Sequence, residues 1–175
     1  MSTTRRGFLG AAALVGAVPL LDRLSPLTFD GARQGRRVFL HGVASGDPLH
    51  EAVILWTRAT PPGDGRGAVV PVECEIARDD NFRQIVGRVA QLATAARDFT
   101  IKIDARGLEP GTTYYYRFSA LGEASPVGRT RTLPRHTERV RLAAASCANL
   151  PAGFFNVYRA IAARPDLDAV LHLGD

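Results

Sequence analysis

The chain has 175 residues, of which 46% are hydrophobic and 22% are charged, and it carries a formal net charge of +5. This composition is typical of a globular protein and excludes a chain that is disordered throughout. The positive charge is small and scattered, so we predict no nucleic-acid-binding surface. The two cysteines, Cys74 and Cys147, are too few for the disulfide framework of a small secreted domain.

Residues 1–34 are predicted to be an export signal and a linker. Paired arginines, Arg5 and Arg6, precede an apolar run over residues 10–21. This layout is typical of a twin-arginine signal, which the translocation machinery recognises and which is usually removed afterwards. The run is shorter than the roughly 20 residues that a membrane-spanning helix needs, so we predict no stable membrane span. We therefore expect a protein exported to the periplasm, the cell wall or the medium, with the twin-arginine translocation machinery as a partner.

Residues 35–135 show the pattern of an all-β sandwich. Short runs of alternating apolar and polar residues are separated by turns rich in Gly, Pro and Asp. In residues 72–76 and 99–104 this alternation predicts strands with one buried side and one solvent-facing side. Cys74 falls on the buried side of its strand, where a thiol behaves as a small hydrophobic group. We prefer this interpretation to a disulfide with Cys147, which sequence alone cannot support.

A turn at Pro110 and Gly111 leads into a predicted strand in which Tyr114, Tyr116 and Phe118 share the buried face. A turn followed by such a strand resembles the tyrosine corner of fibronectin type III and immunoglobulin-like domains. In those domains a phenol hydrogen-bonds to the preceding turn. We therefore expect one of these tyrosines to tether the turn.

Two further features of this region have a functional and a structural interpretation. Trp56 is predicted to be a core or inter-domain anchor rather than a ligand-stacking ring. His41, Ser45 and Asp47 are the residue types of a hydrolase triad, but no Gly-x-Ser-x-Gly turn is present to expose the serine. We prefer a turn in which Asp47 caps backbone amides ahead of Pro48.

The pattern changes over residues 136–175, which predict a strand, a helix and a second strand. Residues 140–145 and 167–173 are short, mostly apolar runs suited to strands buried on both faces. Between them, four apolar residues recur with helical spacing: Phe154, Val157, Tyr158 and Ile161. This order of elements predicts a right-handed crossover that joins two parallel strands.

Cys147 and Asp175 each lie just past the end of one of these strands. Because parallel strands end at the same edge of a sheet, we expect the two side chains to lie close together, where open α/β sheets bind ligands. Gly174 permits a close approach of the backbone. Iron or zinc accepts a sulfur ligand, and two carboxylate oxygens can bridge to a harder cation such as calcium. The alternative is a buried, inert thiol and a helix-capping carboxylate.

Several motifs, in this order, resemble the PhoD-type alkaline phosphatase family. They are the twin-arginine leader, His-Gly-Val-Ala-Ser-Gly-Asp-Pro at 41–48, Leu-Trp-Thr-Arg at 55–58, Ser-Cys at 146–147 and His-Leu-Gly-Asp at 172–175. The resemblance implies a mainly β chain: a fibronectin III/immunoglobulin-like sandwich followed by the first βαβ unit of a truncated α/β metallophosphoesterase domain. It also implies an alkaline phosphatase or phosphodiesterase that hydrolyses phosphate esters outside the cytoplasm, with iron and calcium as cofactors.

The resemblance further implies a role for individual residues. Cys147 is expected to be a thiolate ligand of iron, and Asp175 the carboxylate that bridges iron and calcium. We expect His172 to pack or to orient a ligand, and Asn149 is a candidate for the same orienting role. Other ligands that the family pattern places after Asp175 are not among these residues. The chain is therefore expected to be inactive as a phosphatase by itself, and its catalytic residues stay unassigned.

Two alternatives remain open. The first is a secreted fibronectin-like binding module without catalysis, which would act through the surface of its sandwich. The second is an enzyme similar to the purple acid phosphatases, which also pair a sandwich with a dimetal domain. Those enzymes have an aspartate at the end of the first strand, so Cys147 favours the PhoD-type interpretation.

Overall fold

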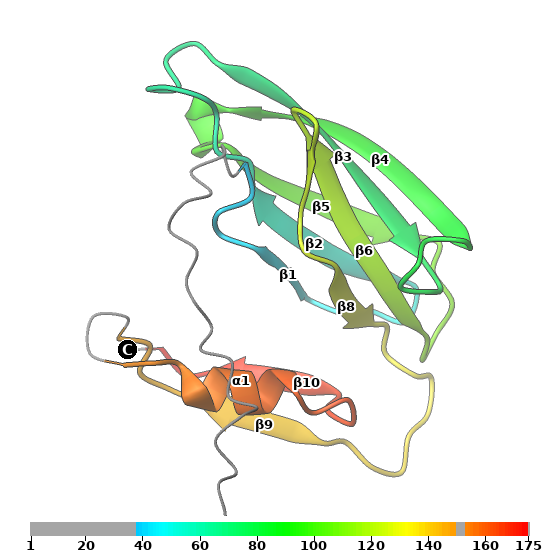
Figure 1. Ribbon diagram of the computed structural model, residues 1–175. Helices are drawn as coiled ribbons and strands as arrows, with labels where there is room; N and C mark the ends of the chain where they lie inside the picture. Colours follow the sequence, from blue (N-terminus) through cyan, green and yellow to red (C-terminus); the bar gives the residue numbers. More distant parts are fainter. Residues whose placement is uncertain (1–37, 150–152, 175) are drawn as a thin grey trace, which may run out of the picture. The chain divides into compact units, whose positions relative to one another are not determined.

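The structure is a computed structural model that describes residues 38–149 and 153–174 (Figure 1). The predicted export signal therefore lies outside the described residues. The first part of the chain contains β1 (Val43–Gly46), β2 (Ala52–Arg58), β3 (Val69–Ala77), β4 (Ile85–Thr94), the 3-10 helix η1 (Ala95–Arg97), β5 (Thr100–Arg106), β6 (Thr113–Ala120), β7 (Glu123–Ala124) and β8 (Gly128–Arg131). It is followed by β9 (Leu142–Ala145), α1 (Asn156–Ala162) and β10 (Ala169–His172).

Strands β1 to β8 form two antiparallel sheets. One sheet has the order β1-β2-β5, and the other has the order β4-β3-β6-β7, with β8 also paired to β6. One core cluster takes side chains from both sheets, including Leu55 and Ile103 from the first and Cys74 and Phe118 from the second. Two sheets that share one apolar interior form a β-sandwich, as predicted.

The alternation of side chains decides which face of each strand is buried. In β3, Val72, Cys74 and Ile76 are buried, while Glu73 and Glu75 lie on the other face. Cys74 is fully buried, and neither it nor Cys147 forms a disulfide bond. Burial raises the pKa of the Cys74 thiol to about 12, so this group stays protonated at neutral pH.

The alternation predicted over residues 99–104 holds with one correction. Ile101 and Ile103 are buried in β5, which begins at Thr100. Phe99 is also buried, but it precedes the strand and has a left-handed backbone with φ 55°. Its side chain therefore reaches the core from a turn, where the alternation of buried and exposed side chains in a strand does not apply.

The predicted tyrosine corner is present. The Tyr114 hydroxyl accepts a hydrogen bond of 2.9 Å from the backbone N–H of Glu109. The buried hydroxyl of Thr132 donates to the Glu109 carbonyl at 2.6 Å and accepts from the Thr112 N–H at 3.0 Å. A buried phenol and a buried hydroxyl thus satisfy backbone groups of the turn that leads into β6.

Trp56 does not belong to the core, contrary to the first part of its prediction. In β2 the fully buried side chains are those of Val53, Leu55 and Thr57, and Trp56 alternates with them on the half-buried outer face. Because Ile54 is also apolar, both faces of β2 read as hydrophobic in the sequence. The periodicity therefore does not identify the core face, and the tertiary structure decides it.

In the part of the chain that the structure describes, no helix has both the length and the apolar character needed to span a membrane.

We predict that Tyr114→Phe lowers the free energy of unfolding by about 1–3 kcal/mol, because the Glu109 N–H loses its partner in a partly buried turn. Urea-induced unfolding monitored by circular dichroism measures this change. Tyr115→Phe is the matched control, since its side chain lies on the opposite face of β6, and it should shift stability much less. Equal stability of the two variants would contradict the role of the Tyr114 hydroxyl.

Candidate metal centre

The two strands that precede the predicted metal ligands are parallel neighbours, as predicted. In the register of β9 and β10, Leu142 lies opposite Ala169 and Ala145 lies opposite His172. Helix α1 connects the two strands along the chain. Parallel strands deliver the residues that follow them to one edge, so this arrangement can bring distant parts of the sequence together.

Pairing continues past the ends of both strands. The Leu173 N–H donates to the Ala145 carbonyl at 2.8 Å, and the Cys147 N–H donates to the Gly174 carbonyl at 3.1 Å. Cys147 therefore lies beside the residue that directly precedes Asp175. Asp175 itself lies outside the described residues, so the role of the thiolate and carboxylate as a metal site stays a prediction.

The backbone is unusual at both of these strand ends. Cys147 has φ 61° and Gly174 has φ 90°. A positive φ is accessible to glycine at little cost, whereas a residue with a side chain pays about 1–2 kcal/mol. This conformation is found at functional sites but also in turns such as those at Phe99 and Phe155, so at Cys147 it marks a tight turn at the end of β9.

The side chain of Cys147 is suited to a metal in a way that Cys74 is not. Cys147 is exposed, and its sulfur lies 3.7 Å from the Ser146 hydroxyl. Cys74 is buried and protonated, while metal ligation requires an accessible sulfur that can lose its proton. A thiolate beside a carboxylate is a donor set that fits iron, and spare carboxylate oxygens fit calcium.

His172 contacts the neighbourhood of the predicted ligands. Its Nδ1 accepts a hydrogen bond of 3.1 Å from the Gly174 N–H, and its Nε2 lies 2.7 Å from the Tyr158 hydroxyl. The sequence motif singled out His172 but marked Tyr158 only as part of an apolar helix face. A tyrosine in such a stripe could have been flagged because its hydroxyl needs a polar partner.

The other predicted residues of this region lie as follows. Asn149 is exposed, two positions after Cys147, and its orienting role stays a prediction. The helix begins at Asn156, so Phe154 is not part of it and is 88% exposed. A left-handed Phe155, with φ 51°, separates Phe154 from the helix and turns the chain there.

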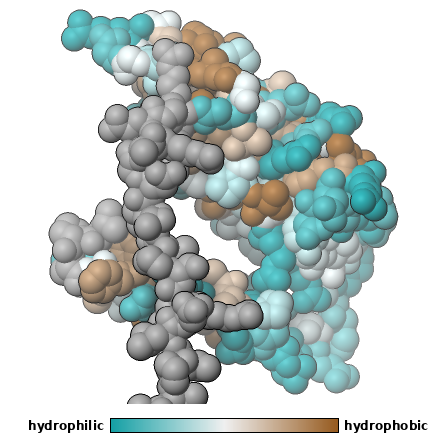
Figure 2. Space-filling view, in the orientation of Figure 1, coloured by the Kyte–Doolittle hydropathy of each residue, from teal (hydrophilic) through white to brown (hydrophobic). Residues whose placement is uncertain are grey.

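The two strands are not buried on both faces within the described residues, contrary to that part of the prediction. Five apolar side chains of β9, α1 and β10 and their ends are about half exposed or more: Leu142, Val157, Val170, Leu171 and Leu173. Figure 2 shows that hydrophobic and hydrophilic side chains are interspersed on the visible face of the molecule. One helix and one neighbouring strand leave most of each strand's surface uncovered.

Two of the residues considered as a hydrolase triad, Ser45 and His41, interact with residues outside the triad. The Ser45 hydroxyl hydrogen-bonds with Tyr116. Burial raises the pKa of Tyr116 to about 12. The pKa of Asp98 is lowered, first by a hydrogen bond from Arg58 and to a smaller extent by the charge of His41. Asp47 takes a left-handed backbone with φ 47°, a conformation that aspartate tolerates in turns.

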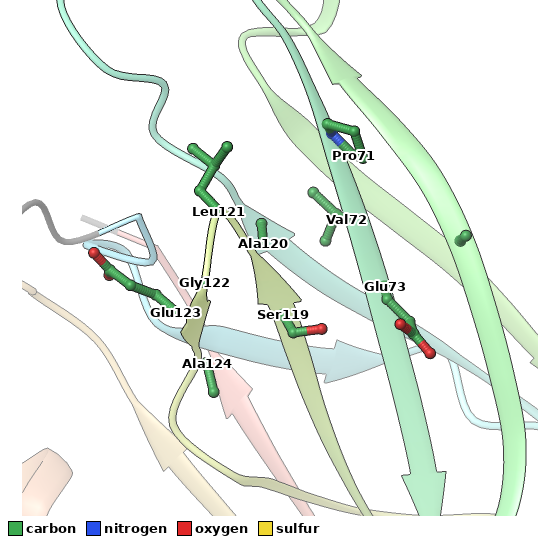
Figure 3. Close-up of a pocket in the computed structure, with 10 residues that line it drawn as sticks. Pro71, Val72, Glu73, Ser119, Ala120, Leu121, Gly122, Glu123 and Ala124 are labelled. Atoms are coloured by element: carbon green, nitrogen blue, oxygen red, sulfur yellow. The ribbon is translucent and has the colours of Figure 1, made fainter.

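A surface pocket of about 600 Å³ lies on the sandwich (Figure 3). It is lined by Pro71, Val72, Glu73, Ala90, Ser119, Ala120, Leu121, Gly122, Glu123 and Ala124. None of the residues predicted for the metal centre lines it. Glu123 already accepts a hydrogen bond of 2.9 Å from the Val38 N–H.

Within residues 38–149 and 153–174, no three or more His, Cys, Asp or Glu side chains gather in a way that could hold a metal ion. The predicted centre has one ligand, Cys147, in this set. The second predicted ligand, Asp175, lies outside the described residues.

Two consecutive parts of the sequence each match a known protein family. The family described as "PhoD-like phosphatase, N-terminal domain" matches residues 25–134, and the family described as "PhoD-like phosphatase" matches residues 142–175. Alkaline phosphatase D of Bacillus subtilis (strain 168) is 43% identical over 144 residues, which cover 78% of this chain and 24% of that protein. A solved structure of PhoD superposes with a TM-score of 0.72 at 42% identity, over 81% of this chain and 28% of that chain. The chain thus spans about a quarter of the length of these relatives.

We predict that iodoacetamide modifies the native chain at Cys147 and leaves Cys74 unmodified at neutral pH. Exposure makes Cys147 accessible, whereas burial both shields Cys74 and raises its pKa to about 12. Mass spectrometry after a timed reaction identifies the alkylated residue. The Cys147→Ser variant should take up no reagent until it is unfolded, and alkylation of its native state would show that Cys74 is accessible.

Proposed function

Because the chain belongs to the PhoD-like phosphatase family, we propose that it contributes to an exported, metal-dependent enzyme that hydrolyses phosphate esters. The family match supports phosphatase chemistry and favours this family over an enzyme of the purple-acid-phosphatase type. The observation that carries the proposal for the site is the backbone hydrogen bond from Cys147 to Gly174. It brings the thiol-bearing residue next to the peptide that leads to Asp175.

In the proposed centre Cys147 would hold iron through its thiolate, and Asp175 would hold iron and calcium through its carboxylate. When bound, the two cations polarise the phosphoryl oxygens and stabilise the negative charge that develops during hydrolysis. The hydrogen bond between Cys147 and Gly174 supports a position for the Cys147 ligand at the edge where the parallel strands end. Asn149 is proposed to orient a ligand or substrate group from the loop after Cys147.

Export is the second part of the proposal. It is supported by Arg5 and Arg6 followed by the apolar run of residues 10–21, a pattern that the twin-arginine machinery recognises. This route carries folded proteins, which is consistent with a metal that is loaded before export. The substrate is a phosphate ester, either a monoester or a diester.

The exposed apolar side chains of β9, α1 and β10 support the proposal that this chain alone does not catalyse hydrolysis. Val170 and Leu171 are 50% and 49% exposed, and a parallel strand is normally covered on both faces. We propose that these 175 residues need further structure against this surface, and further ligands, before they catalyse hydrolysis.

We expect the 175-residue chain alone, supplied with iron and calcium, to release no product from p-nitrophenyl phosphate or bis(p-nitrophenyl) phosphate. The reason is that two ligands cannot fix the geometry of a two-metal centre. Release of p-nitrophenol is followed by absorbance, with the metal-free chain as the reference. Turnover above this reference would overturn the limit on activity.

A direct test of the ligand pair uses Zn²⁺, a redox-inert cation that accepts thiolate and carboxylate ligands. We expect Zn²⁺ to slow alkylation of Cys147, and Asp175→Asn to weaken this protection by about tenfold or more, as for loss of a ligand-shell interaction. Asp64→Asn makes the same charge change at an exposed position of the sandwich and should have no effect. A chain whose Cys147 is never protected would favour the alternative of a binding module without catalysis.

A further inference from the structure

Both ring nitrogens of His172 have a partner. The Gly174 N–H, which can only donate, points to Nδ1 at 3.1 Å, and the Tyr158 hydroxyl lies 2.7 Å from Nε2. Nδ1 must therefore be an acceptor without a proton, and the proton of the neutral ring must sit on Nε2. It follows that Nε2–H donates to the oxygen of Tyr158. With both nitrogens engaged in this way, His172 offers no lone pair to a metal.

The ring of His172 is held by helix α1. It stacks on the Tyr158 ring with centroids 5.8 Å apart and an interplanar angle of 20°. Phe155, at the start of the helix, packs edge-on against Tyr158 with centroids 5.3 Å apart. A stacking contact and a hydrogen bond from the same residue restrict both the tilt and the rotation of the imidazole.

His172 in turn holds Gly174. The N–H of Gly174 is bound by His172, and the carbonyl of Gly174 accepts from the Cys147 N–H at 3.1 Å. Both peptide groups that flank this glycine are therefore fixed, although its φ of 90° lies in a region with few constraints for glycine. The peptide that carries the Gly174 carbonyl is the one that joins it to Asp175.

We propose that Tyr158 and His172 are positioning residues that hold the backbone of Gly174 in its hydrogen bond with Cys147, at the edge where the two parallel strands end. The contacts run from the helix, through the imidazole and the glycine, to the cysteine, and they link the crossover to both strand ends. The relevance of this lock to metal binding rests on the proposed function. The lock itself rests only on the contacts described above.

The test compares His172→Ala, His172→Asn and Tyr158→Phe in the metal-free 175-residue chain. In asparagine the side-chain oxygen lies near the position of Nδ1, so His172→Asn keeps an acceptor for the Gly174 N–H and loses the contact with Tyr158. Tyr158→Phe keeps the stacked ring and removes the hydroxyl. Amide hydrogen exchange, followed by NMR at Gly174 and Cys147, measures the lock, and ¹⁵N shifts of the imidazole report which nitrogen carries the proton.

We expect wild-type His172 to be protonated at Nε2. We expect His172→Ala to accelerate exchange at Gly174 and Cys147 by about tenfold, the effect of losing one hydrogen bond. His172→Asn should restore most of the protection, and Tyr158→Phe should give a smaller acceleration. Exchange at Cys74, in the centre of β3, is the control for folding and should stay unchanged in all variants.

The positioning role is overturned by a proton on Nδ1, by unchanged exchange in His172→Ala, or by a His172→Asn variant no better than His172→Ala. The Zn²⁺ protection of Cys147 separates this result from the proposed function. Protection that weakens about tenfold in His172→Ala and recovers in His172→Asn supports both. If Zn²⁺ protects Cys147 from alkylation equally in all variants, the positioning role is contradicted and the metal function is not. If Zn²⁺ does not protect Cys147 in the wild type, the proposed metal function is contradicted, and the hydrogen-exchange data alone test whether His172 holds Gly174.

Discussion

The hydrogen bond from the Cys147 N–H to the Gly174 carbonyl is the contact on which the functional interpretation depends. It continues the pairing of β9 and β10 beyond the strands, to the point where the proposed ligand Cys147 leaves the sheet. A parallel ladder sets this relation through its register, because Ala145 and His172 are already opposite each other. Residues far apart in the chain are thus brought together by backbone pairing, before any side chain contributes.

The left-handed backbone of Cys147 gives this pairing a cost. A non-glycine residue at φ 61° is held there only when its surroundings oppose relaxation. The contacts of Gly174 with both Cys147 and His172 provide such opposition, and stacking of His172 on Tyr158 anchors them to the helix. The strained turn and the packed helix are therefore two parts of one local structure.

Hydrogen bonds of Asp168 connect the sandwich to the strands that follow it. Asp168, just before β10, accepts from the Arg131 guanidinium at 2.8 Å and from the Arg141 N–H at 2.8 Å, and its own N–H donates to the Arg141 carbonyl at 2.9 Å. The Asp168 side chain is about one-third exposed, so the charged pair is only partly screened by water. This carboxylate joins the last strand of the sandwich, β8, to the chain segments that enter β9 and β10.

Local patterns in the sequence determined much of the protein. Alternation predicted the buried faces of β3 and β5, the Pro-Gly turn predicted the tyrosine corner, and the order of strand, helix and strand over residues 136–175 predicted two parallel strands. These features follow from side-chain period and turn chemistry, which act over a few residues. Only the tertiary structure decided that Trp56 lies outside the core and that Phe154 precedes the helix. It also decided that the two ring nitrogens of His172 contact Tyr158 and Gly174. The position of Trp56 depends on which face of β2 packs against the other sheet, that of Phe154 on the left-handed backbone of Phe155, and the contact of His172 with Tyr158 on a partner 14 residues away. Side-chain periodicity does not determine any of these three features.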